Sequence, residues 1–176
     1  RAMERLILKY QNRIYNVILK ICGNPDDASE LTQDTFVKAI DKLDTFKGKS
    51  SFYTWLFRVA VNLTLNYCKK SAKLGFRSLE AQWQGDEQAR QSLKDFISDE
   101  SAADPAQMAQ DRELHELAIK AMMQLDDAQR AVVVLRDIEG MDYAQIAEAL
   151  DIELGTVKSR LFRARSNLRQ ILEALL

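Results

Sequence analysis

The sequence predicts an all-α protein made of two small helical domains joined by a long acidic linker. Only two of the 176 residues are proline and six are glycine, whereas the helix-favouring Ala, Leu, Glu, Gln and Lys are abundant. Apolar residues recur at helical spacing in the first and last thirds of the chain. Residues 74–105 lose this pattern, and such a long irregular stretch separates domains more often than it lies inside one.

The first domain, residues 1–73, is expected to contain three helices. Apolar residues at helical spacing mark a first helix that ends at Cys22-Gly23. Asn24-Pro25 is a start signal, a capping asparagine followed by a proline at the first helical position. A second helix runs from about Asp26 to Leu43, and a third from about Phe52 to Lys70.

The linker, residues 74–105, is expected to hold at most one weak helix, near Glu87 to Phe96. The second domain, residues 106–176, opens with a helix that continues to Met123. The run Leu125-Asp-Asp-Ala-Gln-Arg then caps another helix, which continues through Ile138 and which Glu139-Gly140 ends.

Residues 142–165, DYAQIAEALDIELGTVKSRLFRAR, predict a helix-turn-helix. Asp142 can cap the first helix, with Gln145 completing a capping box. Asp151 and Ile152 make the turn, and the next helix begins between Glu153 and Gly155. Its core stripe recurs at i, i+4, i+7, i+11 and i+14 and consists of Val157, Leu161, Ala164, Leu168 and Ile171.

The opposite face of this helix is centred on Ser159, Phe162, Arg163 and Ser166, and Lys158 and Arg160 flank it. A phenylalanine among arginines is unusual on a solvent face, and it could contact a thymine methyl while the arginines offer forks to guanine. The interpretation is a DNA-reading helix. The alternative is an amphipathic C-terminal hairpin whose arginines are only solvated.

A second group of residues lies on the third helix. One face is core, and the other carries a narrow stripe that consists of Trp55, Arg58, Asn62, Asn66, Lys69 and Lys73. A stacking ring, two amides and cations together suit unpaired bases. Phe46 and Ser50, in the loop just before, could help wall a pocket for an extruded base. The alternative is a helix packed through Trp55, with asparagines that make local hydrogen bonds.

The second helix exposes an acidic face with Glu30, Gln33, Asp34 and Asp41. Charge alone favours a solvated face, and the alternative is a docking surface for an arginine-bearing protein. Lys38 suits either a phosphate contact or helix solubility.

Bulk charge hides a strong asymmetry along the chain. Residues 1–77 carry 14 Lys/Arg against 7 Asp/Glu, residues 78–127 carry 4 against 12, and residues 128–176 balance at 7 against 7. The chain has only two cysteines, far apart in sequence, and one histidine, His115. We therefore expect no disulfide framework, no metal site and no cofactor. No apolar stretch is long enough for a membrane span, so a cytoplasmic protein is expected.

Three segments resemble the bacterial RNA polymerase sigma factors of the extracytoplasmic-function (ECF) group. They are DDASELTQDTF at 26–36, FKGKSSFYTWLFRVAVN at 46–62 and GTVKSRLFRAR at 155–165. The resemblance covers nearly the whole chain in the right order. Two departures are a first helix that looks truncated and a linker that is somewhat long.

The resemblance implies a subunit that gives core RNA polymerase its promoter specificity and is not an enzyme. Its region 2-like domain would bind the clamp of the largest polymerase subunit through Glu30, Gln33 and Asp34. The same domain would melt and read the −10 element through Phe46, Ser50, Trp55, Arg58, Asn62 and Asn66. Its region 4-like domain, next to the polymerase flap, would read the −35 element through Lys158, Ser159, Arg160, Phe162 and Arg163.

The resemblance also implies partners other than promoter DNA and polymerase. Such sigma factors respond to stress and are commonly held inactive by an anti-sigma factor that covers both domains. The acidic linker would thread through polymerase channels, where it would imitate nucleic acid. Cys22 and Cys68 suit either redox sensing or, more commonly, plain burial.

Three other functions fit parts of the sequence. A stand-alone helix-turn-helix regulator explains the second domain and leaves the Trp55–Asn66 stripe without a role. A helical interaction module would use Trp55 and Phe162 as anchors for a protein partner. An enzyme is the weakest alternative, because no paired carboxylates, Cys/His pair or glycine-rich phosphate loop stands at a suitable spacing.

Overall fold

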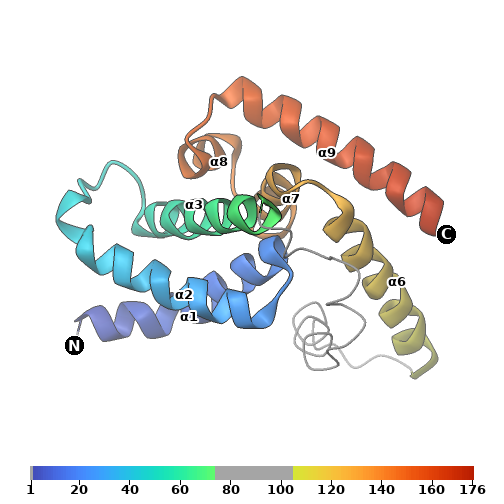
Figure 1. Ribbon diagram of the computed structural model, residues 1–176, viewed down its shortest axis with the longest axis horizontal. Coiled ribbons are helices and arrows are strands. Elements are labelled where there is room, and N and C mark those ends of the chain that lie inside the picture. The colour runs from blue at the N-terminus through green and yellow to red at the C-terminus, as the bar shows by residue number, and fades with distance from the viewer. Residues whose placement is uncertain (1, 74–104) are drawn as a thin grey trace.

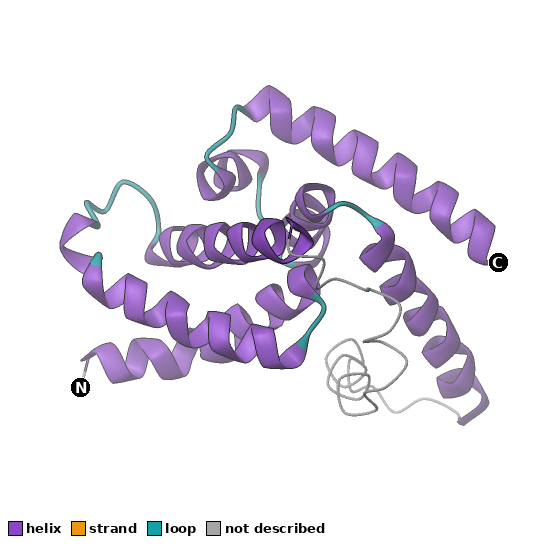
Figure 2. Cartoon of the chain, viewed as in Figure 1, coloured by secondary structure: helices purple, strands orange, loops and turns teal. Residues whose placement is uncertain are grey.

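The computed structural model describes residues 2–73 and 105–176, and these form helices without any strand (Figures 1 and 2). The N-terminal lobe contains α1 (Ala2–Cys22), α2 (Pro25–Asp41), the 3₁₀ turn η1 (Leu43–Thr45) and α3 (Phe52–Lys73). The C-terminal lobe contains α6 (Pro105–Gln124), α7 (Asp127–Val133), the π turn η2 (Val134–Ile138), α8 (Tyr143–Leu150) and α9 (Leu154–Leu175). The all-α prediction is confirmed. The linker expected between the lobes, with its weak helix, lies outside the described residues except for Pro105.

The residues between the helices of the N-terminal lobe explain where α1 ends and where α2 and α3 begin. Gly23 takes φ 77° and ends α1. The Asn24 side chain then accepts hydrogen bonds from the backbone N–H groups of Asp26 (2.9 Å) and Asp27 (3.1 Å). Ser51 does the same for α3, accepting from the N–H of Thr54 at 3.0 Å.

The C-terminal lobe uses the caps that the sequence predicts. Asp126 accepts from the N–H of Gln129 at 2.8 Å, and Asp142 and Gln145 form the full capping box. Asp151 ends α8 in the left-handed conformation, with φ 54°. Aspartate tolerates this conformation better than most residues, so the helix-turn-helix closes without glycine.

Three helix boundaries differ from the sequence prediction. α2 ends at Asp41, because a separate 3₁₀ turn replaces its last residues, and α3 continues to Lys73. The helix expected through Ile138 changes at Val134 into a π turn. There the N–H of Glu139 bonds the carbonyl of Val134, five residues back, at 2.9 Å.

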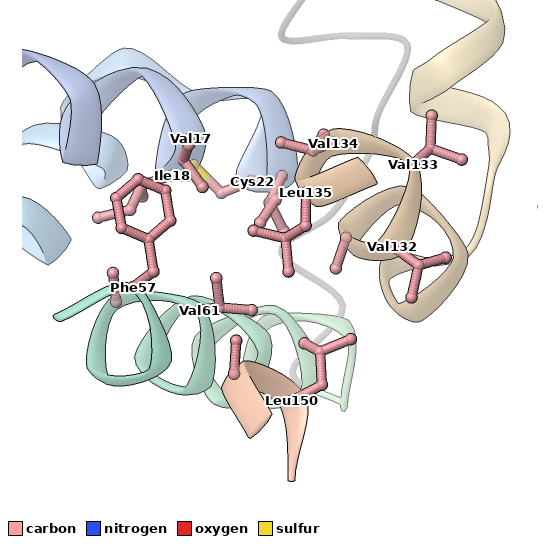
Figure 3. Packing of buried hydrophobic residues seen from close by; sticks show 14 of the residues in the cluster. Val17, Ile18, Cys22, Phe57, Val61, Val132, Val133, Val134, Leu135 and Leu150 are labelled. Atoms are coloured by element: carbon pink, nitrogen blue, oxygen red, sulfur yellow. The ribbon is translucent and has the colours of Figure 1, made fainter. Parts of the chain in front are cut away.

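The two lobes share one hydrophobic core. In the N-terminal lobe α1, α2 and α3 pack against one another, while α8 packs on α3 and α7 packs on α1 and α3. Figure 3 shows Val17, Ile18, Phe57 and Val61 facing Leu135 and its neighbours from the C-terminal lobe. Because this packing runs from one lobe to the other, the described residues form a closed arrangement.

Candidate nucleic-acid interface

A hollow lies between the loop after η1 and the outer face of α3; we call it the α3 hollow. All six residues expected to read the −10 element line it, so the structure brings the predicted group together: Phe46, Ser50, Trp55, Arg58, Asn62 and Asn66. Gly48, with φ 67°, lets the loop turn back toward the helix. The hollow therefore offers aromatic, amide and cationic groups at one place.

An aromatic cluster forms one wall of the α3 hollow. The Trp55 ring lies 5.3 Å from Phe46 and 5.5 Å from Phe52, measured between ring centroids, and Phe46 meets Phe52 edge to face at 5.7 Å. Trp55 is consequently half-buried, more covered than its place on an exposed stripe suggested. The packing alternative is thus partly correct, and it holds the ring in a fixed position from which a base could stack on it.

Lysines surround the hollow on the side of α2 and the loop. Lys38, Lys42, Lys47 and Lys49 line it, and all four are exposed. Sequence reasoning weighed only Lys38 and missed the others. The Lys-Gly-Lys run next to Phe46 was the available signal, because cations beside an aromatic are typical of single-strand binding.

The residues expected to read the −35 element lie together on the outer face of α9. Phe162 is 76 % exposed, Lys158, Ser159 and Arg163 are exposed, and Arg160 is half-buried. Val157, Leu161 and Ala164 are buried on the opposite side, as the periodicity predicts. Arg165 and Arg169, which the sequence reasoning did not single out, extend the cationic surface around Phe162.

The acidic face of α2 contains an apolar side chain. Glu30, Gln33 and Asp34 are exposed, and Val37, on the same face, is 58 % exposed. An exposed valine between carboxylates suits a protein contact better than a purely solvated face. The sequence prediction missed Val37, although its helical spacing from Glu30 and Gln33 was visible.

Polar groups from both lobes meet at Glu139, which follows the π turn. Its Oε2 accepts hydrogen bonds from Arg13 Nε (2.8 Å) and from the Tyr53 hydroxyl (3.1 Å). The side chain of Glu139 is only 5 % exposed, and the Arg13 guanidinium also lies 4.4 Å from the centre of the Tyr53 ring. We call these three residues the Glu139 bridge. Burial lowers the pKa of the nearby Lys20 ammonium to about 8, against the opposing attraction of Glu139.

A buried arginine makes the second polar connection between the lobes. Arg130 of α7 is 1 % exposed and donates to the carbonyl of Ile21 at the end of α1. It also donates to the carbonyls of Met122 (2.9 Å), Met123 (3.1 Å) and Leu125 (2.7 Å). The guanidinium thereby satisfies carbonyls that the ends of two helices leave open. Sequence reasoning missed it, because arginine is rarely buried.

Comparison with known proteins decides the family. The model of Sigma-70 region 2 matches residues 6–74, and that of Sigma-70, region 4 matches residues 115–168. The RNA polymerase sigma-H factor of Pseudomonas aeruginosa is 34 % identical over 100 % of this chain and 89 % of its own length. This chain belongs to the sigma-70 family, in its ECF group. The ECF RNA polymerase sigma-E factor of Escherichia coli K12 is 30 % identical over 94 % of this chain and 83 % of its own length.

Solved structures agree with this ECF assignment. The sigma factor RpoE of Bartonella quintana, solved with the anti-sigma factor NepR, superposes with a TM-score of 0.63 at 26 % identity, over 97 % of this chain and 96 % of that one. CnrH, solved with the cytosolic domain of CnrY, gives the same TM-score at 24 % identity, over 99 % of this chain and 89 % of that one, and shows the shared fold. The predicted family and its two domains, regions 2 and 4, are confirmed.

Within residues 2–73 and 105–176, no cluster of His, Cys, Asp and Glu is arranged to hold a metal ion. Over the same ranges, no helix is long and apolar enough to cross a membrane.

Proposed function

We propose that this ECF sigma factor directs core RNA polymerase to promoters by reading duplex DNA with α9 and unpaired DNA with the α3 hollow. The observation that carries the proposal is the presence of both kinds of face in one chain. An exposed phenylalanine among cations on α9 suits base edges in a major groove. A hollow with a stacked aromatic wall, two asparagines and five cations suits bases that have left the duplex.

At the −35 element, the side chains that contact DNA are Lys158, Ser159, Arg160, Phe162 and Arg163. Arg160 and Arg163 supply bidentate donors for guanine, and Phe162 supplies an apolar contact to a thymine methyl. Arg163 donates through Nε to the carbonyl of Ser159 at 3.3 Å, which leaves the end of its fork for a base. Lys158 contacts phosphate and fixes the position of the helix along the groove.

At the −10 element, a base that leaves the stack enters the α3 hollow. Trp55 and Phe46 provide the stacking surface, and the Asn62 and Asn66 amides offer a donor and an acceptor to base edges. Ser50 and Arg58 contact the backbone of the same strand. Capture of an unpaired base stabilises the melted duplex, so this site also promotes melting.

Polymerase and other proteins contact faces away from the DNA. Glu30, Gln33 and Asp34, with the exposed Val37, form the surface of α2 that binds the clamp of the largest subunit. An anti-sigma factor regulates the chain, as supported by the structure of a similar sigma factor solved with an anti-sigma factor. The protein works in the cytoplasm with polymerase and has no catalytic role of its own.

Transcription with purified components tests the proposal. Core polymerase freed of sigma factors is supplied with this chain and a library of genomic fragments, and the 5′ ends of the transcripts are sequenced. We expect starts that share two spaced elements, and loss of these transcripts when Trp55→Ala replaces the natural chain. No promoter-specific transcript, together with tight binding to a palindromic duplex, would overturn the proposal in favour of a stand-alone helix-turn-helix regulator.

A further inference from the structure

The α3 hollow has the size of a small-molecule pocket. Its volume is about 540 Å³, within the range of about 300–1,000 Å³ that is usual for ligand sites. Residues of α2, α3 and α8, and of the segment between α2 and α3, line it, so a ligand is contacted from several sides. Its aromatic wall, Phe46 and Trp55, offers a stacking surface for one base. A single free nucleotide therefore fits it.

The cations at the hollow outnumber what one nucleotide of DNA requires. Lys38, Lys42, Lys47 and Lys49 are exposed and line the hollow on the side of α2 and the following loop. A nucleotide within a DNA strand brings one negative charge. A free nucleoside diphosphate or triphosphate instead concentrates several charges on one phosphate chain, which flexible ammonium groups suit. Four lysines around one hollow therefore fit a polyphosphate.

A carboxylate lines the same hollow from the other lobe. Glu148 belongs to α8, whereas the other lining residues belong to the N-terminal lobe. Within residues 2–73 and 105–176 its exposed side chain makes neither an ion pair nor a hydrogen bond. Asp151, at the end of α8, is by contrast paired with Arg58 at 3.5 Å. Glu148 is therefore the carboxylate that a ligand in the hollow can use.

A carboxylate distinguishes guanine from the other bases. The Watson–Crick edge of guanine presents two neighbouring N–H donors, N1–H and the N2 amino group, and the two oxygens of a carboxylate can accept from both. Adenine and cytosine each place an acceptor next to their donor on this edge, and the lone pair of that acceptor repels a carboxylate. Glu148 beside a stacking wall therefore favours guanine.

From this arrangement we propose that the α3 hollow is also a binding site for a free guanine nucleotide with two or more phosphates. The base stacks on Trp55 and Phe46, its Watson–Crick edge bonds Glu148, and its phosphates lie among the lysines of α2 and the loop. The inference rests on the proposed base-capture function for the stacking wall and adds a second ligand to it. Because both ligands need Trp55, the nucleotide competes with unpaired promoter DNA.

Binding of guanosine diphosphate, labelled on its ribose with N-methylanthraniloyl, to the full chain tests the proposal by fluorescence. We expect saturable binding that unlabelled guanosine diphosphate displaces about tenfold better than adenosine diphosphate does, the range of one bidentate base contact. Added KCl should weaken binding of the diphosphate more than binding of guanosine, which carries no phosphate. No saturable binding, or equal displacement by the two diphosphates, would overturn the proposal.

Glu148→Gln separates base reading from plain charge. With the proposed contact, the variant binds guanosine diphosphate about tenfold more weakly and adenosine diphosphate no more weakly. If Glu148 acted only as a negative charge, its neutralisation would tighten the binding of both diphosphates, and the proposal would be wrong. Glu153→Gln is the matched control, because Glu153 is an exposed glutamate of the same lobe outside the lining of the hollow. Equal effects of the two substitutions would also overturn the proposal.

A double substitution of lysines tests where the phosphates lie. Lys47→Gln with Lys49→Gln should weaken binding of guanosine diphosphate about fivefold and leave guanosine unchanged, the range of two exposed charge pairs. Lys69→Gln with Lys70→Gln, exposed lysines of α3 outside the lining, is the control and should change neither. Equal losses in the two double variants would contradict phosphates in the hollow.

A fluorescein-labelled single-stranded DNA 10-mer separates this inference from the proposed function. Guanosine diphosphate should displace the 10-mer, and Trp55→Ala should weaken both ligands about tenfold. If Trp55→Ala weakens the 10-mer while the natural chain binds no guanosine diphosphate, only the guanine-nucleotide site fails. If Trp55→Ala weakens the diphosphate but not the 10-mer, the proposed −10 site fails and the nucleotide site stands. The melting temperature of each variant without ligand confirms that it is folded.

Discussion

The two faces proposed to bind nucleic acid differ in how the closed structure leaves them. The α9 face is exposed around Phe162, with its cations directed outward. The α3 hollow is bordered by Glu148, and its Arg58 is paired with Asp151. The comparison teaches that one fold can leave the proposed duplex-reading face open to solvent while it places carboxylates beside the face proposed for unpaired bases. Substitutions in one face, or at the contact between the lobes, can test this difference, and their expected effects range from several kcal/mol to small changes.

Arg130 joins the lobes through the carbonyl of Ile21 and also bonds three carbonyls at the end of α6. Arg130→Met should lower the free energy of unfolding by about 3–5 kcal/mol, because the carbonyls it satisfies at the ends of α1 and α6 would stay buried without a donor. Urea unfolding followed by circular dichroism measures the change. Arg169→Met, an exposed arginine on α9, is the control and should change stability by less than about 0.5 kcal/mol. Equal effects would mean that burial of Arg130 is unimportant.

The aromatic wall distinguishes the hollow from α9. With core polymerase, Trp55→Ala should weaken promoter opening by about 1–3 kcal/mol, the usual contribution of one stacked base, and leave binding to a −35 duplex unchanged. Opening can be followed by permanganate reactivity of unpaired thymines. Because Trp55 also packs on Phe46 and Phe52, the melting temperature of the Trp55→Ala protein must be measured as well. Loss of duplex binding in parallel with opening would remove the distinction between the faces.

A substitution on α9, in contrast, should weaken the binding of promoter duplex. Arg163→Ala should weaken binding to promoter duplex by about 1–3 kcal/mol and relax the base preference at one position of the −35 element. Competition between promoter and mutated duplexes measures both effects. A uniform loss on every sequence would instead assign Arg163 to phosphate contact.

The lowered pKa of Lys20 predicts that the stability of the folded chain depends on pH. Its pKa is lowered by burial from 10.5 to about 8, so between these values the unfolded chain holds more protons than the folded one. The contribution of Lys20 to the free energy of unfolding therefore rises as the pH increases above about 8. Near pH 10 the contribution of Tyr53 begins to act in the opposite direction. The Tyr53 pKa is raised, mainly by burial, so the unfolded chain loses that proton first. Lys20→Met should abolish the rise and stabilise the protein at pH 7 by about 1–2 kcal/mol; an unchanged pH profile would contradict a buried ammonium.

Much of the fold and of both faces was predictable from local signals. The caps at Asn24, Asp126 and Asp142 follow from side chains that compete for open backbone N–H groups, which is a property of neighbouring residues. The exposure of Phe162 follows from its position opposite a regular core stripe. The stripe from Trp55 to Asn66 was found in the same way.

The joining of the lobes was not predictable from such signals. Periodicity shows which face of a helix is apolar, but it does not show which distant helix covers it. The run from Ala131 to Leu135, buried at every position, gave one clue, because a helix that is apolar all round lies inside a core. Arg130 and Glu139 were missed, since their burial depends on partners more than 80 residues away.

The central claim is that the α3 hollow binds unpaired bases while α9 binds duplex, and Asn62→Ala tests it most directly. The variant is compared with Asn167→Ala, an exposed asparagine on α9 whose amide bonds Gln129 at 2.9 Å, away from the outer face of α9. With core polymerase on one promoter, Asn62→Ala should slow opening about tenfold and change closed-complex affinity less than about twofold, while Asn167→Ala changes neither. Equal losses of opening and of duplex binding in Asn62→Ala, or no loss of opening, would contradict the account.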